Sequence, residues 1–121
     1  MFLIVDDDDN IREALEELLA LHGFTGRLAE NGRVALQLLR TRARLPKVIL
    51  LDISMPVLDG WGFLLERDND PRLLTVPVIV ISASLGIEER ARMAGAHSVM
   101  RKPLEPNHLL SVIEPILSAA L

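Results

Sequence analysis

Short runs of branched apolar residues recur along the chain, and segments with a helical period separate them. Three runs are apolar at every position: residues 2–5, 48–51 and 78–81. A strand that is apolar on both faces must be covered on both, which is typical of a parallel sheet in an α/β domain. Two weaker segments, 25–29 and 97–100, complete a predicted set of five strands.

The segments between these strands repeat apolar residues with the period of an α-helix. In the first segment, Asn10 and Glu13 have the spacing of an N-terminal capping box, and Gly23 can end the helix in a left-handed conformation. Pro115 lies within the last predicted helix and should kink it, because its ring removes a hydrogen-bond donor and clashes with the preceding turn. The predicted helices are about residues 10–22, 32–42, 60–67, 87–94 and 105–119.

Strands and helices therefore alternate five times, which implies right-handed crossovers and helices on both faces of the sheet. We predict a single α/β domain over residues 1–121. Its core would be a flavodoxin-like, doubly wound parallel sheet of five strands in the order 2-1-3-4-5, with five helices. In such sheets the binding site lies beyond the carboxyl ends of the strands, between the first and the third.

Length and composition agree with one compact domain and exclude several functional classes. The chain has 121 residues, of which 50% are hydrophobic and 25% charged. It contains no cysteine, which excludes disulfides and thiolate metal sites. Basic residues are not in excess, so the composition gives no sign of nucleic-acid binding. No apolar run approaches the roughly 18–20 residues that span a bilayer. No export signal is recognisable, so we expect a cytoplasmic domain without direct contact to nucleic acid or membrane.

The acidic charge is concentrated in one place. Thirteen basic and seventeen acidic residues give a net charge of -4, which equals the charge of the four consecutive aspartates at 6–9. Asp8 and Asp9 come just before a predicted helix, where acidic side chains interact favourably with the helix dipole, so we assign these two mainly to capping that helix. Asp6 and Asp7 come too early to cap that helix well, so we assign them to a binding site.

Polar residues follow four of the predicted strands at their carboxyl ends: Asp6 and Asp7, Asp52, Ser82, and Lys102. These ends meet at one edge of a parallel sheet, so the side chains should converge. Neighbouring carboxylates repel one another, and a magnesium ion, which takes one or two carboxylates together with phosphate oxygens, removes that repulsion. A carboxylate can also attack phosphorus, and a lysine and a hydroxyl can stabilise the resulting aspartyl phosphate.

The strand ends and their neighbours form blocks with a characteristic order and spacing. The blocks are Val5-Asp6-Asp7, Leu50-Leu51-Asp52 with Met55-Pro56 and Asp59-Gly60, Val80-Ile81-Ser82-Ala83, and Gly95-Ala96 ahead of Lys102-Pro103. With these blocks the chain resembles the receiver domain of two-component response regulators. The resemblance runs from residue 2 to about residue 118.

The resemblance implies a role for each acidic residue. Asp52 would accept the phosphoryl group and would also be a ligand of Mg²⁺, with Mn²⁺ as a possible substitute. Asp7 would bind the metal directly, and Asp6 would do so mainly through water. Ser54 would provide its backbone carbonyl as a further ligand.

The resemblance also implies how the phosphoryl group is received and held. The hydroxyl of Ser82 and the amide of Ala83 would bind it, and Lys102 would pair with Asp52 before phosphorylation and with the phosphate afterwards. The peptide bond before Pro103 would be cis, as in the family. The donor would be a phosphohistidine on a sensor histidine kinase or a phosphotransfer protein.

The family further implies a signalling domain and not an enzyme that turns over substrate. Dephosphorylation would be slow, with Ser54 and Ser84 tuning the access of water. Phosphorylation would switch contacts with a downstream protein or output domain on the face that comprises the fourth and fifth strands and the helices after them.

Two positions depart from the family pattern. Val99 occupies the place where receivers usually carry Tyr or Phe, whose rotamer change links the site to the outer face of the last strand; valine is small and restricted at χ1. Pro115 lies on the helix that relatives often use for dimers or partners. The route from phosphorylation to output is therefore expected to differ here.

Other functions predict other residues. A magnesium-dependent phosphohydrolase usually has a second aspartate two residues after its nucleophile, where this chain has Ser54. A degenerate receiver that only binds proteins would have lost Asp52, Asp7 or Lys102. A flavin site would need phosphate-binding Ser, Thr and Gly after the first strand, where four aspartates repel a phosphate. The structural alternative for Asp52 is that it only caps the following turn through Ser54.

Overall fold

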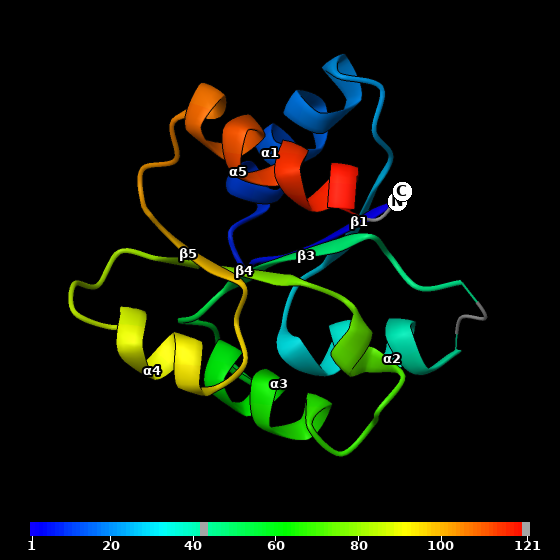
Figure 1. Ribbon diagram of the computed structural model, residues 1–121. Coiled ribbons are helices and arrows are strands. Elements are labelled where there is room, and N and C mark those ends of the chain that lie inside the picture. Colours follow the sequence, from blue (N-terminus) through cyan, green and yellow to red (C-terminus); the bar gives the residue numbers. More distant parts are fainter. Residues whose placement is uncertain (42–43, 120–121) are drawn as a thin grey trace.

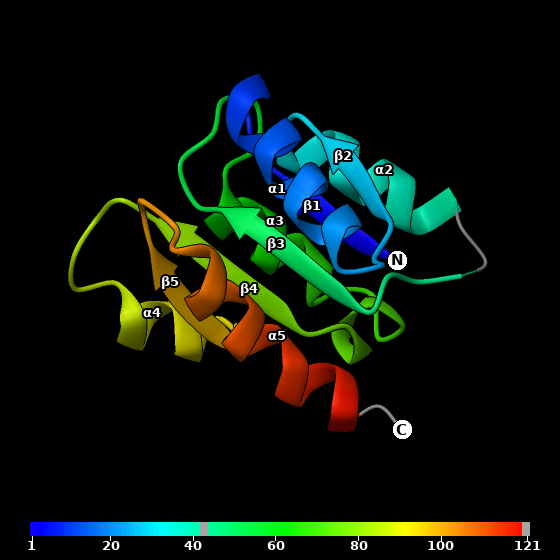
Figure 2. The ribbon, with the colours of Figure 1, turned by 90° about the horizontal axis from the view of Figure 1, so that it is seen from above.

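The five strands form one parallel sheet in the order β2-β1-β3-β4-β5, as predicted (Figure 2). The structure is a computed structural model that describes residues 1–41 and 44–119. Each strand lies where the sequence pattern predicts it, with bounds that differ by at most one residue. The strands are β1 (Phe2–Val5), β2 (Gly26–Ala29), β3 (Val48–Asp52), β4 (Val78–Ser82) and β5 (Ser98–Arg101).

The five predicted helices cover the two faces of the sheet (Figure 1). Helices α1 and α5 lie on one side, and α2, α3 and α4 lie on the other. The predicted end of α2 near residue 42 lies outside the described residues, and a short 3₁₀ helix, η1, was not predicted. The helices are α1 (Asp9–Leu21), α2 (Gly32–Thr41), α3 (Gly60–Arg67), α4 (Glu88–Met93), α5 (Pro106–Ala119) and η1 (Leu73–Thr75).

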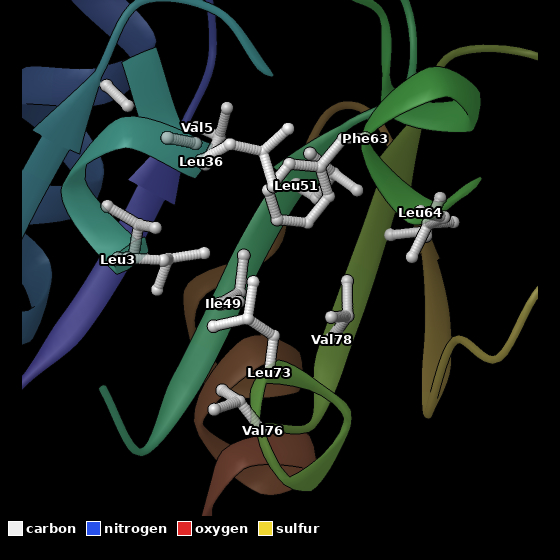
Figure 3. Packing of buried hydrophobic residues seen from close by; sticks show 14 of the residues in the cluster. Leu3, Val5, Leu36, Ile49, Leu51, Phe63, Leu64, Leu73, Val76 and Val78 are labelled. Carbon is white, nitrogen blue, oxygen red and sulfur yellow. The ribbon is translucent and has the colours of Figure 1, made fainter. Parts of the chain in front are cut away.

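Alternate residues of the central strands point to opposite sides of the sheet and build two separate cores. Leu3, Ile49 and Val78 belong to the core under α2, α3 and η1, part of which Figure 3 shows. Phe2 and Leu50 belong to the core under α1 and α5. Because β1, β3 and β4 are buried along their whole length, their continuous apolar runs are the sequence signature of a sheet covered on both faces.

The start of α1 confirms one of the two predictions for its cap and contradicts the other. The N-cap is Asp8, whose carboxylate accepts the backbone N–H groups of Asn10 and Ile11 at 2.9 and 3.2 Å. The predicted capping box of Asn10 and Glu13 is therefore wrong, because a carboxylate two residues earlier already satisfies the free donors of the first turn. Gly23 has the predicted left-handed conformation after the helix, with φ of +82°.

Helix α5 runs from Pro106 to Ala119 with Pro115 inside it. The side chain of Pro115 is exposed, so the ring lies on the solvent side of the helix. The kink at Pro115 stays a prediction. Within the described residues, no helix has both the length and the apolar character needed to cross a membrane.

Candidate functional site

The register of the sheet brings the first acidic residues together. Val5 of β1 lies opposite Leu51 of β3, so the next residues along these strands, Asp6 and Asp52, lie side by side beyond the strand ends. Ser82 ends β4 opposite Arg101 of β5. All these positions are at the carboxyl edge of the sheet, where the strand order reverses between β1 and β3.

Three carboxylates form the centre of the site. Asp6, Asp7 and Asp52 each place one carboxylate oxygen within 4.8 Å of the others. Asp6 and Asp52 are buried and Asp7 is exposed, so the cluster is open on one side. Oδ2 of Asp6 is buried without a hydrogen-bond partner among the described residues. Oxygen ligands in this number and state of burial fit a hard divalent cation such as Mg²⁺.

Burial makes ionisation of Asp6 unfavourable. It raises the pKa of Asp6 to about 6, and the neighbouring charge of Asp52 adds to this effect. The backbone N–H of Asp8, which donates to Oδ1 of Asp6 at 2.9 Å, and the ammonium of Lys102 act in the opposite direction. A cation bound next to Asp6 would therefore stabilise its ionised form.

Lys102 places a positive charge beside the carboxylates of Asp52 and Asp6. Its Nζ lies 3.3 Å from Oδ2 of Asp52 and 3.6 Å from Oδ2 of Asp6. Burial by itself would lower the pKa of Lys102, but the charges of Asp52 and Asp6 raise it above its usual value. The backbone N–H of Lys102 donates to the carbonyl of Ser82 at 2.9 Å, and the Lys102-Pro103 peptide bond is cis, as predicted.

Two serines flank the acidic centre, as the sequence predicts. Ser82 is buried, and its Oγ accepts the backbone N–H of Ser84 at 2.9 Å, which leaves its own hydroxyl proton to donate. The backbone N–H of Ser54 donates to Oδ1 of Asp52 at 3.3 Å. Asp52 thus also caps the following turn, while its other oxygen faces Lys102. Ala83 is exposed directly after Ser82.

The loop between β3 and α3 folds back, so that the start of α3 lies close to the end of β3. The N–H of Gly60 donates to the carbonyl of Ile53 at 3.0 Å, and a Cβ atom at Gly60 would lie 2.9 Å from the carbonyl oxygen of Asp52. Asp59 is the N-cap of α3 and accepts the N–H of Gly62 at 2.8 Å. Val57 has φ of +71°, an unusual conformation for a β-branched residue. The Asp-Gly pair therefore holds α3 against Asp52.

Arg12 belongs to the site and was missed by the sequence analysis. Its Nη1 donates to the backbone carbonyl of Asp6 at 2.6 Å, and its Nη2 pairs with the carboxylate of Asp9. The guanidinium thus holds both ends of the acidic run. The position of Arg12 three residues after Asp9, within reach across one helical turn, was the available signal.

Val99 lies in β5 opposite Val80. It is partly buried and packs against the core that contains Leu3, Ile49 and Val78. It lies three residues before Lys102, where the family pattern has an aromatic residue. A valine at this place fills little volume and has one restricted torsion, so a large rotamer change is not available to it.

The fold and this edge of the sheet together define a class: a flavodoxin-like α/β domain with a candidate cation site and a lysine at its switch point. The family model described as the response regulator receiver domain matches residues 2–114. The chain therefore belongs to the receiver-domain family of two-component response regulators.

Individual relatives agree with this assignment. The regulatory protein AtoC of Escherichia coli is 38% identical over 118 residues, which are 95% of this chain and 24% of AtoC. The response regulator MprA of Mycolicibacterium vanbaalenii is 34% identical over 95% of this chain and 49% of MprA. The chain thus spans about a quarter to a half of these two proteins.

A solved structure shows the same fold. The chemotaxis response regulator CheY4 of Vibrio cholerae has a TM-score of 0.85 and 26% sequence identity to this chain, with 95% of this chain and 96% of CheY4 covered.

Proposed function

We propose that Asp52 accepts a phosphoryl group in a Mg²⁺-dependent reaction and that the modified domain changes its protein contacts. One observation carries this proposal: the buried carboxylate of Asp52 lies within 4.8 Å of two further carboxylates and 3.3 Å from the ammonium of Lys102. Acidic oxygens suit a cation and an adjacent ammonium suits a phosphate, so the site has complementary groups for both.

The residues present fit a divalent cation. Asp7, Asp52 and the backbone carbonyl of Ser54 would hold Mg²⁺ or Mn²⁺, with Asp6 mainly acting through water. The bound cation would neutralise charge on the carboxylates and on the phosphoryl oxygens. Among the described residues, Oδ2 of Asp6 has no hydrogen-bond partner and faces only one cation, the distant ammonium of Lys102 at 3.6 Å, and the pKa of Asp6 stays raised; both observations support a further cation at this carboxylate.

The transfer itself requires little from the protein beyond placement. An oxygen of Asp52 forms the new bond to phosphorus while the bond from phosphorus to the imidazole nitrogen of a phosphohistidine donor breaks, and the electron pair stays on the imidazole. Lys102, already near Asp52, turns to the phosphoryl oxygens. The hydroxyl of Ser82 and the amide of Ala83 donate to the same oxygens.

The reaction ends in a signal and not in turnover. Ser54 occupies the place of the general acid of aspartate-based phosphohydrolases and has no acidic proton to give. We expect slow autodephosphorylation, with exposed Ser54 and Ser84 influencing how water approaches Asp52.

The partners follow from the same proposal. A sensor histidine kinase or a histidine phosphotransfer protein in the cytoplasm would supply the phosphoryl group to residues 1–121, which would act as one domain. A downstream protein or output domain would bind the β4-α4-β5-α5 face, where Val99 replaces the usual aromatic residue and Pro115 lies within α5. No direct contact with nucleic acid or membrane is proposed.

The test is incubation with Mg²⁺ and acetyl phosphate, followed by intact mass. We expect a gain of one phosphoryl group that EDTA prevents and that Asp52→Asn abolishes. Asp8→Asn is the matched control: it removes a carboxylate from the acidic run but keeps the N-cap of α1, so it should be phosphorylated. A gain that persists in Asp52→Asn, or rapid release of phosphate from varied phosphate esters, would contradict the proposal.

A further inference from the structure

An open groove lies between α3 and α4, on helices that cover the opposite side of the sheet from α1 and α5 (Figure 1). Its volume is about 410 Å³, and its lining includes Trp61, Leu65 and Met93. Leu65 is 70% exposed and Met93 is 76% exposed, so two large apolar side chains of the same groove face water. Apolar side chains gathered in one groove, and not scattered singly, indicate an interaction surface.

The groove carries opposite charges at its two ends. Trp61, Leu65 and Asp68 follow one another at the i, i+4, i+7 spacing of one face of α3, and Asp68 is the C-cap. The guanidinium of Arg90 lies over the ring of Trp61, 3.9 Å from its centroid, at the start of α3. Asp68 lies seven residues further on, which is about 10 Å along a helix axis.

The two helices run in the same direction, which keeps these charges apart. At the other end of the pair, Nη2 of Arg67 at the end of α3 donates to the carbonyl of Gly95 just after α4, at 3.2 Å. Arg90 therefore marks the beginning of the groove, Leu65 and Met93 its middle, and Asp68 its end. Both charged side chains are exposed, and neither forms a salt bridge with another described residue.

We propose that this α3–α4 surface binds the same surface of a second copy of the chain in an antiparallel, two-fold arrangement. A two-fold axis through the middle of the groove brings Arg90 to the partner's Asp68 and Asp68 to the partner's Arg90, while the apolar side chains meet between them. A partner with only one charge would leave either Arg90 or Asp68 unpaired. The self-complementary order of charges thus favours a second copy.

The cation–π contact with Trp61 holds the Arg90 side chain in one position before it meets the partner's Asp68. Arginine loses rotamer freedom when an interface immobilises it, and the ring already restricts the side chain before association. The surface is small, so the dimer is weak and depends on concentration. Because the groove is separate from Asp52, the dimer does not require phosphorylation.

Sedimentation of the wild-type chain and of charge reversals tests the proposal. Between about 1 μM and about 1 mM, a range that covers weak dimers, we expect the mean mass of the wild type to rise from 13.4 kDa towards twice that value. Arg90→Asp and Asp68→Arg each place like charges opposite one another at both contacts, so each should raise the dissociation constant at least about tenfold. An equimolar mixture of the two variants should dimerise again, because both contacts then join opposite charges.

Two further measurements separate this interface from loss of folding or from another surface. Arg92→Asp makes the same charge change on α4 at a residue that pairs with Glu89 outside the groove, and should leave the dissociation constant within about twofold. Thermal unfolding confirms that each variant is folded. A wild type that stays monomeric throughout, a dimer that survives both reversals, or a mixture no more associated than its components would overturn the proposal.

Discussion

Asp6 is a carboxylate held under unfavourable conditions. It is 1% exposed, lies beside Asp52, and its Oδ2 has no hydrogen-bond partner among the described residues. Its pKa of about 6 in the fold compares with about 3.9 for an aspartate in an unfolded chain. The folded state therefore binds this proton more tightly, so its contribution to stability is complete below about pH 4 and is lost as the pH rises through about 6.

Replacing the Asp6 carboxylate with an amide should remove the free-energy cost of ionising this buried group. In the metal-free protein, Asp6→Asn should raise the free energy of unfolding by about 1–3 kcal/mol at pH 7.5 relative to its effect at pH 4. Urea denaturation in EDTA at the two pH values measures this difference. The same change at exposed Asp7 should show a smaller difference. An equal effect of Asp6→Asn at both pH values would contradict the assignment.

Arg12 holds the backbone that carries the proposed metal ligands. Arg12→Gln removes the charge that lies between the carbonyl of Asp6 and the carboxylate of Asp9. We expect the affinity for Mg²⁺ to fall about tenfold, as is typical when an outer-shell partner of a metal ligand is lost. Arg12→Lys, which keeps the charge, should recover part of it.

Titration calorimetry with Mg²⁺ measures the effect. Arg33→Gln is the control, since Arg33 pairs with Glu66 away from the acidic site and should not change the affinity. An unaltered affinity in Arg12→Gln would refute a positioning role.

At the scale of elements, the start of α3 approaches the end of β3 closely near the site. A Cβ atom at Gly60 would lie 2.7 Å from Cα of Ile53 and 2.9 Å from the carbonyl oxygen of Asp52, and neither backbone atom can move without displacing the strand end. At Gly62 the nearest atom is the end of the Leu58 side chain, which can rotate away. The two glycines of one helix turn therefore differ in what they tolerate.

Gly60→Ala should destabilise the fold by about 1–3 kcal/mol, because the added methyl group forces α3 away from β3. It should also slow phosphorylation, since Asp52 ends that strand. Gly62→Ala should change the free energy of unfolding by less than about 1 kcal/mol, with the gain in helix propensity offsetting a small repacking. Denaturant unfolding compares the two variants, and equal losses would show that the close approach at Gly60 is unimportant.

Sequence patterns located the elements well but not all of their ends. The pattern offers both Asn10 and the pair of Asp8 and Asp9 to cap α1, and the structure uses Asp8. Both residue types cap helices, and within a run of four aspartates the local sequence favours no single one. The choice depends on where β1 ends, because Asp6 must remain beside Asp52.

For the whole molecule, cation binding should be coupled to stability. A cation that binds the folded site and not the unfolded chain stabilises the fold by RT ln(1 + [L]/Kd), or about 2.7 kcal/mol at one hundred times Kd. We expect Mg²⁺ to raise the midpoint of thermal unfolding of the wild type, and EDTA to reverse the rise. Asp7→Asn should lose most of this effect, because the exposed carboxylate is the one most open to an entering ion. An identical rise in both proteins would exclude Asp7 as a ligand.

The sequence by itself determined the class of fold, the strand order and the meeting of Asp6, Asp52 and Lys102 at one edge of the sheet. It could do so because strands that are buried on both faces read as continuous apolar runs, and because the polar residues that end them must meet at one edge. Only the tertiary structure decided three further features of the site. These are the raised pKa of Asp6, the contacts of Lys102 with two carboxylates, and the hydrogen bond from Arg12 to the carbonyl of Asp6.

The tertiary structure also decided the groove between α3 and α4, in which Arg90 lies over the ring of Trp61. The pairing of Arg12 with Asp9 spans only one helical turn, whereas each of these features depends on burial and on distances of a few ångströms between parts of the chain that only the packed sheet and helices bring together.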